Sequence, residues 1–95
     1  MEILDNAELE TSLAKLGGWE GDSRQIEKSW KFKDFVSAFG FLSQVAILAE
    51  KEGHHPEIFN VYSNVTLKLS THDAGDRVTS KDISLAKAIN GIGSD

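Results

Sequence analysis

The chain has 95 residues, a formal net charge of −5 with histidine neutral, and no cysteine. This length predicts one domain over residues 1–95, and the lack of cysteine excludes a disulfide scaffold, a thiolate zinc site and a cysteine nucleophile. The acidic balance argues against non-specific binding to nucleic acid or to anionic membranes.

The sequence also bears on where the protein works. No apolar stretch reaches the roughly 18 residues that a membrane span needs. The chain starts Met1-Glu2-Ile3-Leu4-Asp5, which is acidic and lacks the basic segment of a signal peptide. We therefore expect a cytoplasmic protein with no membrane and no nucleic acid among its partners.

A first helix is predicted over residues 6–16. Asp5 is its expected N-cap, because Glu8 stands at capping-box spacing from it. Its apolar face recurs at helical spacing and consists of Leu9, Leu13 and Leu16. The glycine pair at 17–18 should end the helix, since glycine accepts the left-handed conformation of a C-terminal cap.

A β-hairpin should follow. Trp19 is expected to begin a short strand, residues 21–23 supply turn chemistry, and residues 25–32 alternate between apolar and polar side chains. Lys28 interrupts the apolar face of that second strand, which consists of Ile26, Trp30 and Phe32. An edge strand or a snorkelling side chain would each tolerate such a lysine.

The longest element is predicted to be a helix from Asp34 to Glu52, with Asp34 as a candidate cap. Its expected apolar stripe consists of Phe35, Ala38, Phe39, Leu42, Val45, Ala46 and Ala49. Other apolar residues fall largely outside that stripe: Val36, Phe41, Ile47 and Leu48. This excess indicates that the helix also packs against another subunit. The alternative is a helix buried on two sides within one small domain.

Gly53 should end the long helix, and a second hairpin should follow. Residues 59–61 and 65–69 have the alternation of strands, and Ser63-Asn64 is a natural tight-turn pair between them. Residues 71–77 are polar and typical of a loop.

The last helix should span residues 80–89. Thr79 is its expected cap, and Asp82 stands at the capping-box position. Gly91 and Gly93 mark a frayed end.

The resulting order is α-β-β-α-β-β-α. Two hairpins and three helices predict an α+β fold with a four-stranded antiparallel sheet and the three helices on one face. The alternation within the strands predicts that the other face is more polar and open to a ligand or partner.

All three histidines, His54, His55 and His72, lie at or near boundaries between predicted elements. Imidazole exchanges protons near neutral pH, so these residues are candidates for acid–base chemistry. Other interpretations remain: His54 would only terminate the helix, His72 would only be a solvated loop residue, or the three would bind zinc with or without Glu50 or Asp73. No phosphate-binding loop, dinucleotide fingerprint or nucleophile elbow is present.

Several features in order resemble the signature of pterin-4a-carbinolamine dehydratases. Residues 50–65 carry E-K-x-x-H-H-P followed by N-x-Y-x-x-V, and residues 67–72 end in L-x-T-H. Gly18-Trp19 and residues 82–86 resemble the family's early G-W pair and its last helix. The segment 73–81 is one residue longer than the commoner family form, and the capping-box position already gives Asp82 a structural role.

The resemblance implies the family's α-β-β-α-β-β-α fold and an enzymatic activity. The reaction is the dehydration of 4a-hydroxytetrahydropterin to quinonoid dihydropterin, which recycles the pterin after aromatic amino-acid hydroxylation and needs no metal and no redox cofactor. An acid should protonate the departing hydroxyl and a base should take the N5 proton, and imidazole suits both tasks.

The resemblance also implies residue roles. His54 and His72 are expected to be the proton-transfer pair, and His55 to bind or orient the pterin. Glu50 and Asp82 are candidates for support, Glu50 by a hydrogen bond to an imidazole. The matching substrate-contact segments contain Pro56, Thr71, Asp73 and Ala74.

The family associates through helices and sheet edges, which implies a homodimer or homotetramer formed through the 34–52 helix. Two other functions stay open. The animal members resemble binding modules that stabilise dimers of a transcription factor, so a non-catalytic dimerisation or coactivator role is one alternative. A pterin binder serving another pathway, such as molybdopterin metabolism, is the other.

Overall fold

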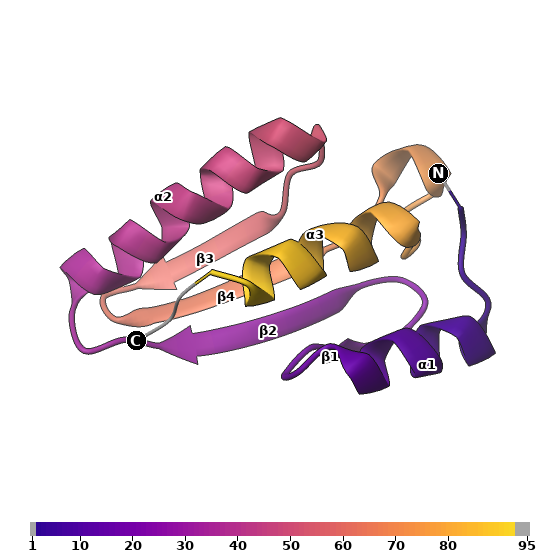
Figure 1. Ribbon diagram of the computed structural model, residues 1–95, viewed down its shortest axis with the longest axis horizontal. Coiled ribbons are helices and arrows are strands. Elements are labelled where there is room, and N and C mark those ends of the chain that lie inside the picture. Colours follow the sequence, from indigo (N-terminus) through magenta and orange to yellow (C-terminus); the bar gives the residue numbers. More distant parts are fainter. Residues whose placement is uncertain (1, 93–95) are drawn as a thin grey trace.

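The computed structural model describes residues 2–92, and Figure 1 shows its elements along the chain. The predicted order of three helices and four strands is confirmed, with bounds that differ from the predicted ones by one or two residues. The elements are α1 (Asn6–Lys15), β1 (Glu20–Gly21), β2 (Ile26–Lys31), α2 (Phe35–Glu52), β3 (Glu57–Val61), β4 (Asn64–Leu69), a 3₁₀ turn (His72–Ala74) and α3 (Ser80–Asn90). Gly93, where fraying was predicted, lies outside the described residues. Within residues 2–92, none of the helices has the length and apolar character that crossing a membrane requires.

The four strands form one antiparallel sheet in the order β1-β2-β4-β3. The register places Ile26 opposite Leu69 and Trp30 opposite Val65, so the apolar side chains of β2 and β4 share one face. The opposite face is more polar, as predicted from the alternation. It carries Glu27, Ser29, Lys31, Phe59, Val61, Asn64, Thr66 and Lys68.

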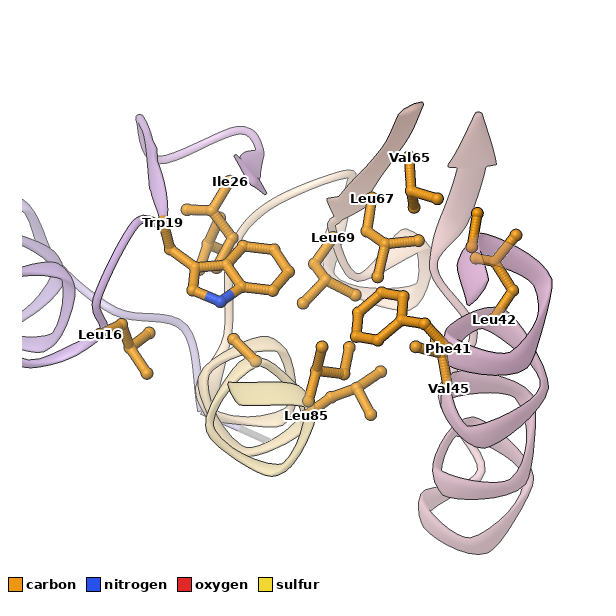
Figure 2. Close-up of a cluster of buried hydrophobic side chains, with 14 of the residues drawn as sticks. Leu16, Trp19, Ile26, Phe41, Leu42, Val45, Val65, Leu67, Leu69 and Leu85 are labelled. Carbon is orange, nitrogen blue, oxygen red and sulfur yellow. The ribbon is translucent and has the colours of Figure 1, made fainter. Parts of the chain in front are cut away.

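The core lies between the sheet and the three helices. Figure 2 shows Phe41 of α2 and Leu85 of α3 pointing toward Leu67 and Leu69 of β4, and Leu16, which directly follows α1, beside Trp19 in the same cluster. Trp19 is also buried, and its indole N–H donates to Asn90 Oδ1 at 2.9 Å, which satisfies the one polar group of that side chain.

At the helix starts, the caps follow the predicted sequence signals. The predicted glycine cap at the end of α1 is wrong, because the C-cap of this helix is Leu16 in an extended conformation. The Asp5–Glu8 and Thr79–Asp82 pairs form complete capping boxes at the starts of α1 and α3. Asp34 caps α2 by accepting a hydrogen bond from the Ser37 backbone N–H at 2.7 Å. This bond stabilises the charged carboxylate and lowers the pKa of Asp34.

The predicted inward face of α2 is wrong in part. Phe41 is buried, whereas Phe39 is 53% exposed and Phe35 is 46% exposed. The buried residues of the helix are Ala38, Phe41, Leu42, Val45 and Ala49. Apolar residues surround most of this helix, so spacing alone could not orient it, and packing against the sheet decided which side faces inward.

Two details of the hairpins also differ from prediction. The turn between β3 and β4 is at Tyr62-Ser63 rather than Ser63-Asn64. The Asn60 amide stabilises it by donating to the carbonyl oxygens of Tyr62 and Asn64 at 3.2 and 3.0 Å. The edge-strand explanation for Lys28 is wrong, because β2 lies between β1 and β4.

Lys28 instead extends out of the core along its neighbours. Its ammonium donates to the Gly17 carbonyl at 2.8 Å and to Asn90 Oδ1 at 3.0 Å, and it lies 5.1 Å from the centre of the Trp30 ring. Partial burial lowers the pKa of this lysine. The apolar stem therefore covers core residues while the charge reaches polar partners.

Candidate active site

The end of α2, the 3₁₀ turn and the start of α3 meet at one end of the sheet (Figure 1). A cleft of about 220 Å³ opens between them. It is lined by Gly53, His54, His55, Ser70, Thr71, His72, Asp73 and Lys81. The cleft therefore contains all three histidines of the chain.

The end of α2 places His54 at this cleft. Gly53 has a φ of 64°, the left-handed conformation that suits glycine. Its N–H donates to the Glu50 carbonyl at 3.2 Å, and the His54 N–H donates to the Ala49 carbonyl at 3.1 Å. These two bonds form a Schellman motif. The backbone of His54 thus terminates the helix, while its side chain is free for another contact.

The His54 side chain contacts a buried carboxylate. Its Nε2 lies 2.5 Å from Asp82 Oδ1, and the two side chains are 11% and 0% exposed. A carboxylate only accepts hydrogen bonds, so Nε2 carries the proton in this pair. The contact fixes the orientation of the imidazole ring.

Asp82 is also held by residues beside the cleft. Its Oδ2 accepts from the Thr71 hydroxyl at 2.8 Å and from the Thr79 backbone N–H at 2.9 Å. The Thr71 hydroxyl has only one proton, which it gives to Asp82, so the Thr79 hydroxyl donates to Thr71 across their 2.8 Å separation. Asp82 therefore caps α3 and positions His54 at the same time.

His55 and Glu50 form a second pair at the surface. His55 Nε2 lies 2.7 Å from Glu50 Oε1, and the side chains are 64% and 79% exposed. Glu50 thus contacts His55. It does not contact His54, although His54 stands one helical turn after Glu50 in the sequence. Water screens a pair this exposed, so its contribution to stability is small.

His72 has a carboxylate partner of its own within the same turn. Its Nδ1 lies 2.5 Å from Asp76 Oδ1, with side chains 83% and 65% exposed. Each of the three imidazoles therefore bonds through one ring nitrogen to a different carboxylate. The second ring nitrogen of each imidazole has no hydrogen-bond partner among residues 2–92. This nitrogen is Nδ1 in His54 and His55 and Nε2 in His72.

The structure brings together most of the residues that the sequence singled out. The three histidines, Thr71 and Asp73 line the cleft. Asp82 is hydrogen-bonded to His54, and Glu50 is hydrogen-bonded to His55. Pro56 and Ala74 are not among the residues that line it.

Sequence reasoning missed Lys81, Ser70 and Asp76. Lys81 precedes Asp82 on α3 and Ser70 precedes Thr71, so each stands next to a residue that was identified. That adjacency was the one available signal for them. Asp76 gave no signal, because a polar loop residue four positions after a histidine contacts it only if the chain turns back.

The zinc interpretation requires donors that converge on one point. Within residues 2–92, no group of three or more His, Asp or Glu side chains is arranged to hold a metal ion. A larger hollow of about 400 Å³ lies between α2 and α3, but its lining has no ionisable side chain: Gln44, Ile47, Leu48, Ala88, Gly91 and Ile92. The histidine cleft is therefore the candidate active site, and its imidazole side chains are of the type that can transfer protons.

Comparison with known families identifies one match. The sequence model of the family described as "Pterin 4 alpha carbinolamine dehydratase" matches residues 2–92 of the chain. Two similar relatives carry the name "Putative pterin-4-alpha-carbinolamine dehydratase". The one from Rhizobium rhizogenes is 50% identical over 90 residues, covering 93% of this chain and 88% of its own. The one from Prochlorococcus marinus strain MIT 9515 is 46% identical, covering 95% and 93%.

Two solved structures are also similar. One, a transcriptional coactivator/pterin dehydratase from Brucella melitensis, has a TM-score of 0.88 and 44% identity and covers 94% of this chain and 96% of its own. The other, a pterin dehydratase-like protein identified as a RuBisCO assembly factor in the α-carboxysome, has a TM-score of 0.63 and 23% identity, covering 81% and 89%. At that identity the second shows the shared fold alone.

Proposed function

This chain belongs to the pterin-4a-carbinolamine dehydratase family, and we propose that it catalyses the dehydration of 4a-hydroxytetrahydropterin to quinonoid dihydropterin. The observation that carries the proposal is a cleft lined by three imidazoles, each hydrogen-bonded to its own carboxylate. Such groups exchange protons near neutral pH, which is the chemistry that this dehydration needs.

The reaction moves two protons and one electron pair. The N5 lone pair forms a C4a=N5 double bond as the C4a–O bond breaks and its electrons leave with the hydroxyl. An acid protonates that hydroxyl, which departs as water, and a base takes the N5 proton. No oxidant or reductant takes part, so the side chains need only give and take protons and hold the ring.

We assign the two proton transfers to His54 and His72. They come from different elements, His54 from the end of α2 and His72 from the 3₁₀ turn, and both line the cleft. His55 then binds or orients the pterin, with Thr71 and Asp73 as further contacts in the lining. The cleft of about 220 Å³ is smaller than the roughly 300–1,000 Å³ of typical small-molecule sites, so part of the substrate extends into solvent.

The direct test is a rate. The 4a-carbinolamine is generated in situ and its ultraviolet decay is followed with wild-type protein and with His72→Ala. Wild type should accelerate the decay, and the catalysed rate of the variant should be about 10²-fold lower than that of wild type. The His72 side chain is 83% exposed, so circular dichroism and the melting temperature should not change. No acceleration from folded wild-type protein would exclude the dehydratase function.

We further propose that the protein forms a homodimer or homotetramer through α2. The outer side of this helix is apolar, with Val36 79%, Phe39 53% and Ile47 69% exposed. Strand β3 runs at the sheet edge beside it and exposes Ile58 and Val61. Apolar surface of this kind and an unpaired strand edge both favour association.

Ile47→Asp should weaken that association. Burying an unpaired carboxylate in place of an apolar contact should raise the dissociation constant by about 30-fold, the equivalent of about 2 kcal/mol. Sedimentation velocity over a concentration series measures the change. Ala14→Asp, which adds the same charge to an exposed position on α1, is the matched control and should not alter association. A monomeric wild type at all concentrations would contradict the proposal.

The apolar outer side of α2 also supports a second candidate function, a binding module for a different protein. The Brucella melitensis structure carries both descriptions in its title, transcriptional coactivator and pterin dehydratase. Wild type that folds, fails to accelerate dehydration and stays monomeric would favour this function.

In the dehydratase proposal the protein works in the cytoplasm and serves an aromatic amino-acid hydroxylase pathway.

A further inference from the structure

The residues after β4 form a closed loop that turns His72 and Asp76 toward each other. The Thr71 N–H donates to the Arg77 carbonyl at 2.9 Å, and the Arg77 N–H donates back to the Thr71 carbonyl at 3.4 Å. Gly75 and Asp76 both have left-handed backbone conformations, with φ of 76° and 58°. Two consecutive left-handed residues reverse the chain, which brings Asp76 Oδ1 to 2.5 Å from His72 Nδ1.

The backbone at Asp76 is unfavourable for most side chains. The left-handed region is unfavourable for residues other than glycine, and Asn and Asp are the usual exceptions. Within residues 2–92, the one hydrogen bond of the Asp76 side chain is to His72. The carboxylate is thus held by a left-handed backbone, which aspartate tolerates, against a histidine of the candidate active site.

We propose that Asp76 is a positioning residue for His72 that selects its tautomer. A carboxylate only accepts, so the bond requires a proton on Nδ1 and leaves the lone pair of the neutral ring on Nε2. Nε2 has no hydrogen-bond partner in the described part of the chain. Asp76 therefore determines that Nε2 is the atom of His72 that exchanges a proton with substrate. The catalytic part of this inference rests on the proposed function, whereas the tautomer does not.

The exposure of the pair sets the size of the effect. His72 and Asp76 are 83% and 65% exposed, so water and salt weaken their attraction. Removing the hydrogen-bond partner that orients a metal-binding histidine typically costs 10–100-fold, and we apply that range to His72. We expect the lower end of that range here, about tenfold in kcat, with KM unchanged because Asp76 does not line the cleft.

Nuclear magnetic resonance of ¹⁵N-labelled histidine tests the tautomer directly. Long-range ¹H–¹⁵N correlation at a pH where His72 is neutral distinguishes a protonated ring nitrogen from one with a lone pair. Wild type should show His72 protonated at Nδ1. In Asp76→Gly, which is unstrained in the left-handed turn, both nitrogens should show the averaged shifts of mixed tautomers, and kcat should fall about tenfold.

Two variants and one internal signal serve as controls. Asp76→Asn keeps tolerance of the left-handed backbone and an amide oxygen that accepts from Nδ1, so it should retain the tautomer and most of the rate. Asp73→Asn removes a charge from the same turn without a hydrogen bond to His72, so the His72 tautomer should not change. His54, which bonds to Asp82, should keep its tautomer in every variant.

Several results would overturn the inference. Wild-type His72 protonated at Nε2, or an unchanged tautomer in Asp76→Gly, would show that Asp76 does not select it. A changed tautomer with unchanged kcat would remove its part in catalysis. If wild type shows the expected tautomer but no dehydratase activity, the proposed function fails while the role of Asp76 in orienting His72 stands.

Discussion

Replacing His54 with Gln should lower the rate of carbinolamine dehydration by about 10²–10⁴-fold, the usual contribution of a positioned acid or base. The amide of Gln has no proton-exchanging group near neutral pH. Its NH₂ can still donate to Asp82, so the buried carboxylate keeps a partner. We therefore expect the free energy of unfolding to remain close to that of wild type, and stopped-flow absorbance on the carbinolamine measures the loss of rate.

The comparison variant is His54→Ala. It removes the acid–base group and the hydrogen bond together, so it should lose both the rate and part of the stability, because it leaves Asp82 Oδ1 without its donor. Equal rate losses in the two variants with unequal stability would assign the rate effect to proton transfer. A His54→Gln protein with nearly wild-type rate would show that His54 does not carry a proton.

Replacing Asp82 with Ala should destabilise the protein by about 3 kcal/mol or more, since each of three buried donors left without an acceptor costs about 1–3 kcal/mol. Asp82 is fully buried and accepts from His54, Thr71 and the backbone of Thr79. Alanine would leave all three without their acceptor and would also break the capping box of α3. Urea unfolding followed by circular dichroism measures the loss.

Glu8→Ala is the matched control for the capping box. Glu8 occupies the same box position in α1, but its side chain is exposed to solvent. Its removal should cost about 1 kcal/mol or less, because water replaces the lost contact. The difference between the two variants then isolates the buried contacts of Asp82. Equal losses would show that Asp82 acts only as a cap, and activity unchanged in Asp82→Ala would remove its role in positioning His54.

The caps and the strand alternation were readable from the sequence because they depend on residues close together in the chain. Asp5 with Glu8, and Thr79 with Asp82, are three residues apart, and a helix start brings such residues together wherever it forms. The alternation in residues 65–69 likewise separates two faces of a strand without any tertiary information. These local signals were sufficient to predict the α+β order.

Other features were not predictable because they depend on which of several compatible arrangements is packed. Phe39 and Phe41 are equally apolar, and the sequence placed the wrong one in the core. The turn between β3 and β4 lies one residue earlier than predicted, because Asn64 pairs with Lys31 of β2 and with Val61 of β3 and so belongs to the strand. In both cases contacts with the rest of the fold chose between alternatives of similar local energy.

The sequence by itself determined the elements, their order and the identity of the three histidines as candidates for acid–base chemistry. Only the tertiary structure decided the partners of those histidines. His54 meets Asp82 across 28 positions because α2 ends where α3 begins, and His72 meets Asp76 because two left-handed residues reverse the turn. Hydrogen bonds reach about 3 Å and require alignment, so sequence spacing identifies the groups but only the folded chain sets the distances between them.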